Sequence, residues 1–136
     1  MKLTVDANVF FAGLIKSGLS RRILFHPGLE LNAPYFLLEE VGKYRAVLGS
    51  KSKLSESDFD DLLSGMLAQI QLIEETELKS YILPASKLVR DPKDWPYLAC
   101  ALCFGSDILS NDPHLHSQKR VTTYSLEALA KKMRLI

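Results

Sequence analysis

The sequence predicts a single α/β domain, a three-layer α/β/α sandwich with a central parallel sheet of about five strands. Three observations support this class. The chain has 136 residues, the usual size of one domain, and no repeat or linker divides residues 1–136. Hydrophobic residues make up 47% of it, enough to form a core without disulfide or metal cross-links. Short apolar runs alternate with helical patterns, which favours a parallel sheet covered on both faces.

Five short apolar runs have the character of strands. The first, KLTV, is followed at once by a carboxylate, and the fourth, DILS, is followed by the turn sequence NDP. The strands are predicted at residues 2–5, 29–32, 71–75, 107–110 and 121–125. Because helical segments separate most of these runs, we expect the strands to lie parallel in one sheet.

The clearest helix follows Ser55, whose spacing to Asp58 resembles a capping box. Apolar residues then recur every three or four positions as far as Ile70, which is the pattern of an amphipathic helix. Further helices are predicted over residues 19–25, 35–48, 94–105 and 126–133. The third of these is apolar on nearly all sides, so we expect it to be largely buried.

Local signals also predict where the helices begin and end. Ser17 or Ser20 is expected to cap the helix over 19–25. Pro34 is expected in the first turn of the next helix, which Gly49 and Ser50 should end. The less regular segments are expected to be a loop at 13–18, a short helix broken at Pro84 within 77–89, and a turn at 111–113.

Neither the net charge nor the cysteine content points to a particular function. Seventeen basic and sixteen acidic side chains nearly cancel, so net charge favours no particular partner. No apolar run approaches the roughly 18 residues of a membrane span, and no secretory signal is visible, so we expect a cytoplasmic protein. Cys100 and Cys103 have C-x-x-C spacing, but there is no second pair and their surroundings are apolar. We therefore expect two free cysteines rather than a redox or zinc site.

Two carboxylates follow predicted strands at the points where those strands end. Asp6 comes directly after the first strand, and Asp112 comes two residues after the fourth. Parallel strands bring all their carboxyl ends to one edge of the sheet, which is where α/β domains bind ligands. These two acids are therefore expected to lie together, with a helix beginning near Val9 behind them.

Two helices can supply further acids to the same edge. Glu39 and Glu40 are adjacent, and at roughly 100° per residue only one of them can point inward. Glu40 flanks the apolar stripe that contains Val41, so we prefer it to Glu39. Asp91 and Asp94 precede the buried helix, and Asp94 is preferred because it is nearer the helix start.

Each acid also has an ordinary structural interpretation: Asp6 with Asn8 as an Asx turn, Glu40 as a solvated helix residue, Asp94 as an N-cap, and Asp112 as a turn residue. Together, however, several carboxylates on one edge repel one another and lose hydration. A hard cation such as Mg²⁺ or Mn²⁺ relieves that cost, and it can activate water and neutralise phosphate charge.

Nearby polar side chains could support such a cation. Asn8, and either Ser110 or Asn111, could orient a carboxylate or a water molecule by hydrogen bonds. His114 and His116 are expected to lie in a surface loop and not to be metal ligands.

The segments VDANVFFAG, FLLEEV, DPKDWPYLACALCFGSDILSND and VTTYS resemble the PIN domain, a nuclease domain. The resemblance covers almost the whole chain in the right order, although residues 50–90 match only in pattern. Members share a Rossmann-like α/β/α sandwich and three or four acids that bind Mg²⁺ or Mn²⁺. Many are RNases, including toxins of toxin–antitoxin pairs.

The resemblance implies particular roles for individual residues. The metal ligands and catalytic acids would be Asp6, Glu40, Asp94 and Asp112. Asn8 occupies the small polar position after the first acid, Ser110 occupies the hydroxyl position before the fourth, and Asp91 is an extra acid that could assist or replace Asp94. Many members have a further acid where this chain has His114. The resemblance therefore supports one metal more strongly than two.

The expected function is that of a metal-dependent endoribonuclease, the toxin of a toxin–antitoxin pair. RNA, a small antitoxin and a second copy of the chain would be its partners, with no membrane. Candidate residues for holding the RNA backbone are Arg21, Arg22, Lys43, Arg45, Lys51, Lys53, Lys93, Lys119 and Arg120. The alternative is a catalytically weak or inactive RNA-binding or interaction module. A haloacid-dehalogenase phosphatase would need an acid where Asn8 stands, and a receiver domain would need an acidic pair after the first strand.

Overall fold

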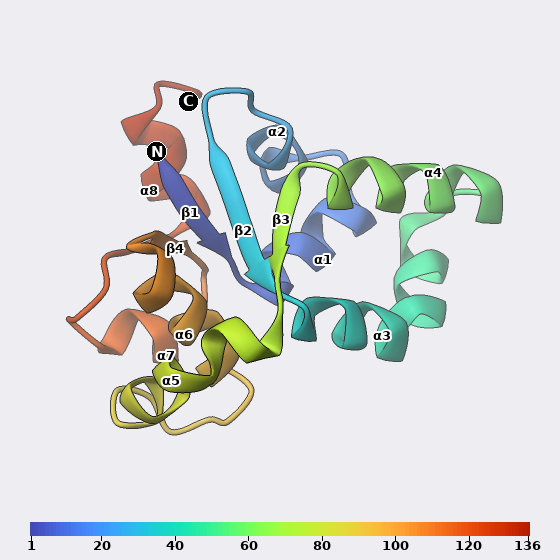
Figure 1. Cartoon of the computed structure of the whole chain (residues 1–136). Helices are drawn as coiled ribbons and strands as arrows, with labels where there is room; N and C mark the ends of the chain where they lie inside the picture. Colours follow the sequence, from blue (N-terminus) through green and yellow to red (C-terminus); the bar gives the residue numbers. More distant parts are fainter.

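A computed structural model describes the whole chain, residues 1–136 (Figure 1). It contains five strands: β1 (Lys2–Val5), β2 (Glu30–Pro34), β3 (Ile70–Ile73), β4 (Asp107–Leu109) and β5 (Thr123–Tyr124). Its helices are α1 (Ala7–Ile15), α2 (Leu19–Leu24), α3 (Phe36–Ser52), α4 (Glu56–Leu67), α5 (Glu75–Ser86), α6 (Trp95–Phe104), α7 (Pro113–Ser117) and α8 (Leu126–Lys132). All strand pairings are parallel, as predicted.

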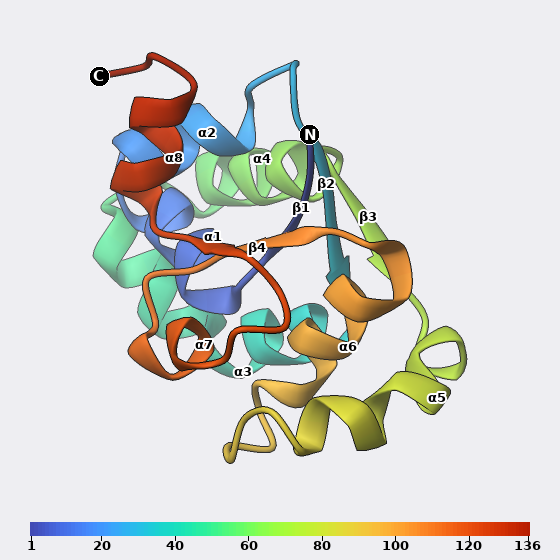
Figure 2. The same cartoon turned by 90° about the vertical axis from the view of Figure 1, so that its left-hand side faces the viewer.

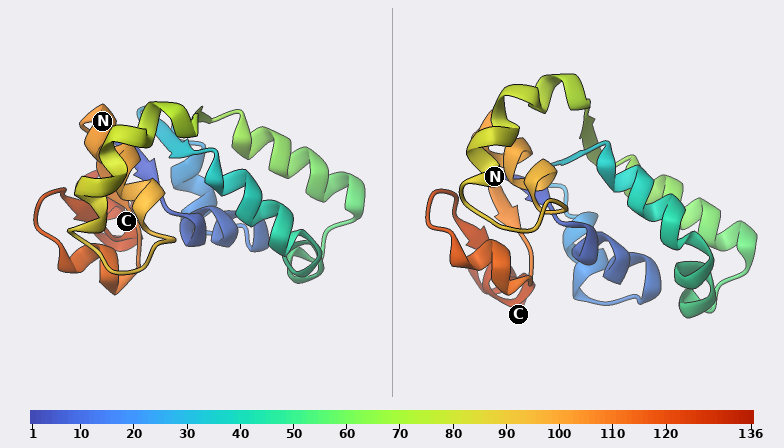
Figure 3. Two further views of the ribbon diagram at one scale, coloured as in Figure 1. Left: turned by 60° about the horizontal axis from the view of Figure 1, so that its bottom comes forward. Right: turned by 90° about the horizontal axis from the view of Figure 1, so that it is seen from below.

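Helices cover both faces of the sheet, which confirms the three-layer prediction (Figures 2 and 3). Helices α1 to α4 and α8 pack on one face, and α5, α6 and α7 pack on the other. The strands divide their side chains between the two cores. Leu3 and Val5 of β1 enter the core under α1, while Ile108 of β4 enters the core under α6. Period-two alternation thus supplies apolar side chains to both faces.

The strand order is β3-β2-β1-β4-β5. From β1 the chain builds outward through β2 to β3, and then returns to add β4 and β5 on the other side of β1. The order therefore reverses between β1 and β4, where Val5 pairs with Leu109. In open α/β sheets, the crevice beyond the strand ends at this switch point is the usual ligand site. Asp6 and Asp112 follow these two strands.

The structure confirms most predicted elements but corrects several boundaries. Residues 13–15 were expected in a loop, yet α1 continues to Ile15. Gly13 is not a breaker there: a Cβ at this position would lie 2.8 Å from Met66 Cε, so glycine allows α4 to pack closely. The N-cap of α2 is Gly18, which has no side chain to cap with, so neither Ser17 nor Ser20 fills that role.

The other corrections lie in the middle and near the end of the chain. Strand β2 continues to Pro34, and α3 extends past Gly49 and Ser50 to Ser52. Pro34 can occupy a strand terminus because its ring is compatible with extended backbone. Helix α5 continues through Pro84 as far as Ser86 instead of breaking there. The expected turn and surface loop contain a short helix, α7.

Several local predictions are confirmed. Ser55 caps α4 by accepting a hydrogen bond from the backbone N–H of Asp58 at 3.1 Å. Helix α6 ends at Gly105, which adopts a left-handed conformation (φ 62°) that favours glycine. Cys100 and Cys103 are free. None of the helices combines the length and apolarity that a membrane crossing requires.

Candidate metal centre

Ser110 links the two acids that follow β1 and β4. Its hydroxyl donates a 2.7 Å hydrogen bond to Oδ2 of Asp6 and accepts one from the backbone N–H of Asp112 at 2.9 Å. Asp6 stands at the N-cap of α1 and is only 4% exposed, yet its side chain does not cap the helix. Ser110, and not a helix cap, therefore fixes the position of this carboxylate.

Asp112 and Asp94 both stand at helix starts, but only one of them acts as a cap. Asp112 Oδ1 accepts a hydrogen bond from the backbone N–H of His114 at 2.9 Å and so begins α7. Asp94 precedes α6 without a capping hydrogen bond. It is 7% exposed, and its Oδ2 atom is buried without any hydrogen-bond partner. Asp91, by contrast, is exposed and accepts a hydrogen bond from the backbone N–H of Lys93.

Glu40 comes from α3 on the opposite side of the same opening. Its Oε1 atom accepts a 2.8 Å hydrogen bond from the hydroxyl of Tyr97, a buried residue of α6. Glu39 lines a different and smaller cavity beside Tyr35. Of the two adjacent glutamates, Glu40 is therefore the one that faces Asp6 and Asp94, as its position beside the apolar stripe predicted.

All four acids line one open cavity of about 540 Å³. Asn8 and Asp91 lie at its edge, together with the cationic side chains of Lys51 and Lys93. Its remaining wall is apolar and is formed by residues of α1 and α3: Ala7, Phe11, Ala12, Ile15, Tyr44, Val47 and Leu48, with Tyr97 of α6. Segments from four parts of the chain thus meet at the switch point of the sheet.

The carboxylates disturb one another's ionisation. Burial, together with the charges of Asp112, Asp6 and Asp91, raises the pKa of Asp94 to about 6. Burial also raises the pKa of Asp6, against the opposing effect of its hydrogen bond from Ser110. Charged Asp112 and Glu40 add to the rise. The cluster therefore gathers more negative charge than the surrounding protein compensates.

The sequence profile of the PIN domain family matches residues 4–132, nearly the whole chain. This chain belongs to the PIN domain family. Among solved structures, the fold is similar to that of a chain in the crystal structure of VapBC2 from Rickettsia felis. That complex is bound to a DNA fragment from its own promoter. The TM-score is 0.68 and the identity 14%, over 92% of this chain and 98% of that one. No protein among curated sequences matches this chain.

The donor set of this PIN domain fits a hard divalent cation. Carboxylate oxygens are the ligands that Mg²⁺ and Mn²⁺ prefer, and an open cavity leaves room for water. The strongest observation is the orphaned Oδ2 atom of Asp94, since a buried carboxylate oxygen without a partner is costly. A cation within reach of Asp6, Asp94 and Asp112 would satisfy that atom and offset the mutual repulsion.

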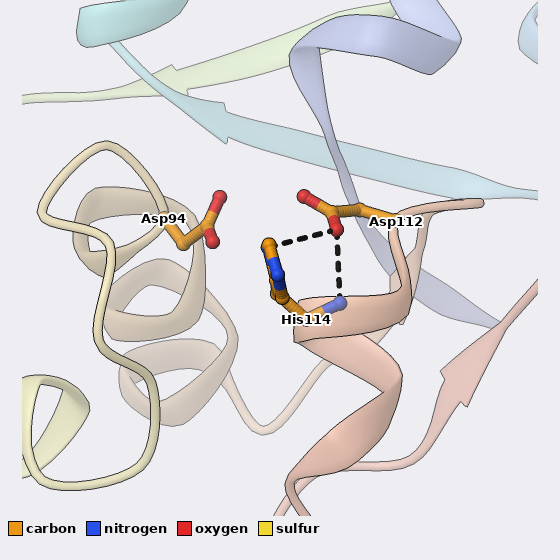
Figure 4. A group of neighbouring side chains, drawn as sticks. All are labelled: Asp94, Asp112 and His114. Carbon is orange, nitrogen blue, oxygen red and sulfur yellow. Dashed lines mark hydrogen bonds and ion pairs between the residues drawn. The ribbon is translucent and has the colours of Figure 1, made fainter.

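Sequence reasoning missed two members of this region. Tyr97 orients Glu40, and its signal was its spacing: it lies three residues after Asp94 on one helix, so both side chains face the same way. His114 was expected in a loop away from metal, yet it lies with Asp94 and Asp112 in a group whose ligand atoms are all within 4.8 Å of one another (Figure 4).

The two predicted amides behave differently from Ser110. Asn8 is exposed and makes no hydrogen bond to a carboxylate, so only its position in the cavity wall relates it to the acids. The Asn111 side chain does not support the acids. Its Oδ1 atom instead accepts a hydrogen bond from the backbone N–H of Leu126, the first residue of α8.

Proposed function

We propose that this protein is a metal-dependent endoribonuclease that hydrolyses RNA phosphodiester bonds, and that it is the toxin of a toxin–antitoxin pair. One observation carries the proposal: four acids from separate segments line one cavity, and a buried oxygen of Asp94 has no partner within the protein. Membership of the PIN domain family adds the expectation of nuclease chemistry.

In this proposal Asp6, Glu40, Asp94 and Asp112 hold Mg²⁺ or Mn²⁺. The bound cation would activate water and neutralise charge on the phosphate. Ser110 keeps the Asp6 carboxylate aimed into the cavity through its 2.7 Å hydrogen bond. Tyr97 does the same for Glu40, and burial keeps its hydroxyl protonated as a donor by raising its pKa far above the ordinary value.

The RNA backbone would be held by cations beside these acids. Lys51 and Lys93 line the cavity and form no ion pair, so both are free to contact phosphates. Arg45 is already paired with Asp60, and Arg21 donates to the backbone carbonyl of Gly13. Contacts to phosphate oxygens give salt-sensitive affinity with little sequence preference.

The toxin role and its partners are the finer part of the proposal. The similar chain from Rickettsia felis belongs to a VapBC2 complex bound to promoter DNA. By analogy, this protein would bind a small antitoxin, form a homodimer and act in the cytoplasm. The presence of a short reading frame for a DNA-binding protein beside this gene would support that role, and its absence would weigh against it.

An RNA cleavage assay tests the nuclease activity. Purified wild-type protein should cleave RNA with Mg²⁺ or Mn²⁺ and lose this activity in EDTA. Asp6→Asn and Asp112→Asn should each remove cleavage while circular dichroism remains unchanged. Asp61→Asn is the matched control, because Asp61 is an exposed acid on α4 away from the cavity.

Equal cleavage by all four proteins would contradict the proposal, since a contaminating nuclease would then explain the activity. A folded wild-type protein that binds RNA without cleaving it, with either metal, would support the non-catalytic RNA-binding alternative instead.

A further inference from the structure

The group formed by Asp94, Asp112 and His114 differs in chemistry from a purely acidic cluster. Asp94 precedes α6, while Asp112 and His114 begin α7, so two separate segments meet here (Figure 4). One ligand atom from each residue lies within 4.8 Å of the others, and the third of these atoms is an imidazole nitrogen. A small cation can contact three atoms at such separations simultaneously after slight side-chain movement.

Asp94 provides an independent observation that favours a ligand between these residues. Its side chain is more than nine-tenths buried, and Oδ2 has no hydrogen-bond partner. In Figure 4 the carboxylate is turned toward Asp112 and His114. A buried acceptor with no donor is costly, and a cation that reached two carboxylates and an imidazole nitrogen would remove that cost.

The position of His114 is set by the local fold. Pro113 occupies the first turn of α7, where its fixed φ favours the helix start. The backbone N–H of His114 then donates to Asp112 Oδ1 at 2.9 Å. Its Nδ1 atom lies 3.5 Å from the same oxygen, on the side of the ring that faces the acids. The ring is otherwise exposed, so it can turn to meet a cation without displacing other groups.

We propose that Asp94, Asp112 and His114 form a mixed carboxylate–imidazole site that binds a first-row transition-metal ion such as Mn²⁺ in preference to Mg²⁺. The two ions have the same charge and both accept carboxylate oxygens. Mg²⁺ is a hard ion that favours oxygen ligands and retains its water, whereas transition-metal ions accept imidazole nitrogen readily. The nitrogen of His114 is therefore the element of this site that discriminates between them.

This inference deepens the proposed function and rests on two of the same carboxylates, but its readout is metal binding and not cleavage. Mn²⁺ binding to the EDTA-stripped full chain is measured by electron paramagnetic resonance, and Mg²⁺ is then titrated as competitor. Wild type is compared with His114→Ala, His114→Asp and His26→Ala. The last variant is the matched control, since His26 lies in the turn before β2 and its ring accepts a hydrogen bond only from the backbone N–H of Gly28.

The wild-type protein should prefer Mn²⁺, and His114→Ala should weaken Mn²⁺ binding about tenfold, comparable with the loss of a supporting ligand contact. His114→Asp supplies oxygen in place of nitrogen, so it should narrow the preference for Mn²⁺ over Mg²⁺. His26→Ala should match wild type. Pulsed measurements on bound Mn²⁺ should detect coupling to a ¹⁴N nucleus in wild type, and this coupling should vanish in both His114 variants.

Two results would overturn the inference. If Mn²⁺ binds to wild type without ¹⁴N coupling, and His114→Ala keeps the same Mn²⁺ and Mg²⁺ affinities, then His114 is no ligand, although the nuclease proposal stands. If wild type binds neither ion, the inference and the metal-dependent nuclease proposal both fail. Thermal melting of each variant confirms that an altered affinity does not reflect unfolding.

Discussion

The protein contains two polar clusters, one built from neutral side chains and the other from carboxylates. The neutral cluster consists of Thr4, Asn32, Cys100 and Ser106, which lie in the middle of the sheet and against α6. Thr4 donates to Asn32 Oδ1 at 2.6 Å, Cys100 Sγ donates to the same atom at 3.1 Å, and Asn32 Nδ2 donates to Ser106 at 2.8 Å. The acidic cluster, Asp6, Glu40, Asp94 and Asp112, lies at the sheet edge beyond it.

The clusters differ in whether the protein completes them. The neutral cluster satisfies its central amide within the fold, as a buried structural network must. The acidic cluster leaves Asp94 Oδ2 without a partner, and burial together with neighbouring like charges raises the pKa of Asp6 and Asp94. A cluster that is complete stabilises the fold, whereas one that is incomplete costs stability until a ligand completes it.

The largest expected effect comes from removing a charge of the acidic cluster. Asp94→Asn should reduce RNA cleavage about 100-fold or more, because electrostatic stabilisation by a correctly held cation is worth several kcal/mol. The same variant should melt at an equal or higher temperature in EDTA, because it relieves repulsion. Cleavage rates and thermal melting measure the two effects, and a variant that is both active and less stable would contradict the comparison.

The neutral cluster should respond in the opposite way. Asn32→Ala should lower the free energy of unfolding by about 3 kcal/mol, since the hydroxyl of Thr4 would lose its buried partner and Ser106 would lose its donor. Cleavage per folded molecule should remain near wild type. Gln71→Ala is the control, because Gln71 pairs in register with Asn32 but is exposed on β3.

Denaturant unfolding measures this difference. If Asn32→Ala lost activity without losing stability, the neutral cluster would support the chemistry and not the fold. That result would contradict the proposed difference between the two clusters.

The sequence predicted that the acids would lie together because the expected topology places them at one edge of the sheet. Asp6 and Asp112 were recognisable because they follow strands, and parallel strands bring such positions together. Glu40 was separable from Glu39 by helical rotation. The different environments of Asp91 and Asp94 could not be predicted from the sequence. The burial of Asp94 and the hydrogen bond from the Lys93 backbone N–H to Asp91 depend on how the loop turns before α6.

The neutral cluster was not predictable from the sequence. Asn32 lies inside a strand, where nothing local distinguishes a buried amide from an exposed one. Its partners come from β1, from α6 and from the turn before β4, and only tertiary packing brings them to it. The same reason explains why the sequence predicted a loop from Gly13 although α1 continues to Ile15. The close approach of Met66 to Gly13 is a long-range contact that the local sequence does not reveal.

The third prediction concerns pH in the metal-free protein. Asp94 has a pKa near 6 when folded, against an ordinary value of 3.8. Between these values the folded state retains a proton that the unfolded state has lost, so stability falls as pH rises from about 4 to 6. Asp94 should contribute about 3 kcal/mol to this fall. Burial and neighbouring charge raise the pKa of Asp6 as well, which acts in the same direction.

The difference between wild type and Asp94→Asn, measured by denaturant unfolding in EDTA at pH 4 and pH 7, isolates this contribution. The difference in free energy of unfolding between the two proteins should be larger at pH 7 than at pH 4. Added Mn²⁺ should reduce this difference by stabilising wild type alone. A gap that does not change with pH would mean that Asp94 has the same pKa in both states.

The smallest expected effect is on thiol reactivity, and it tests whether the neutral cluster is closed. Burial raises the pKa of Cys100 to about 12, and its thiol donates to Asn32, so almost no reactive thiolate forms at pH 8. Cys103 is only partly buried on the same helix. A thiol reagent should therefore modify Cys103 in the native protein and reach Cys100 only on unfolding. Cys103→Ser should abolish the fast reaction, whereas rapid modification of Cys100 would show that the network around Asn32 opens in the folded state.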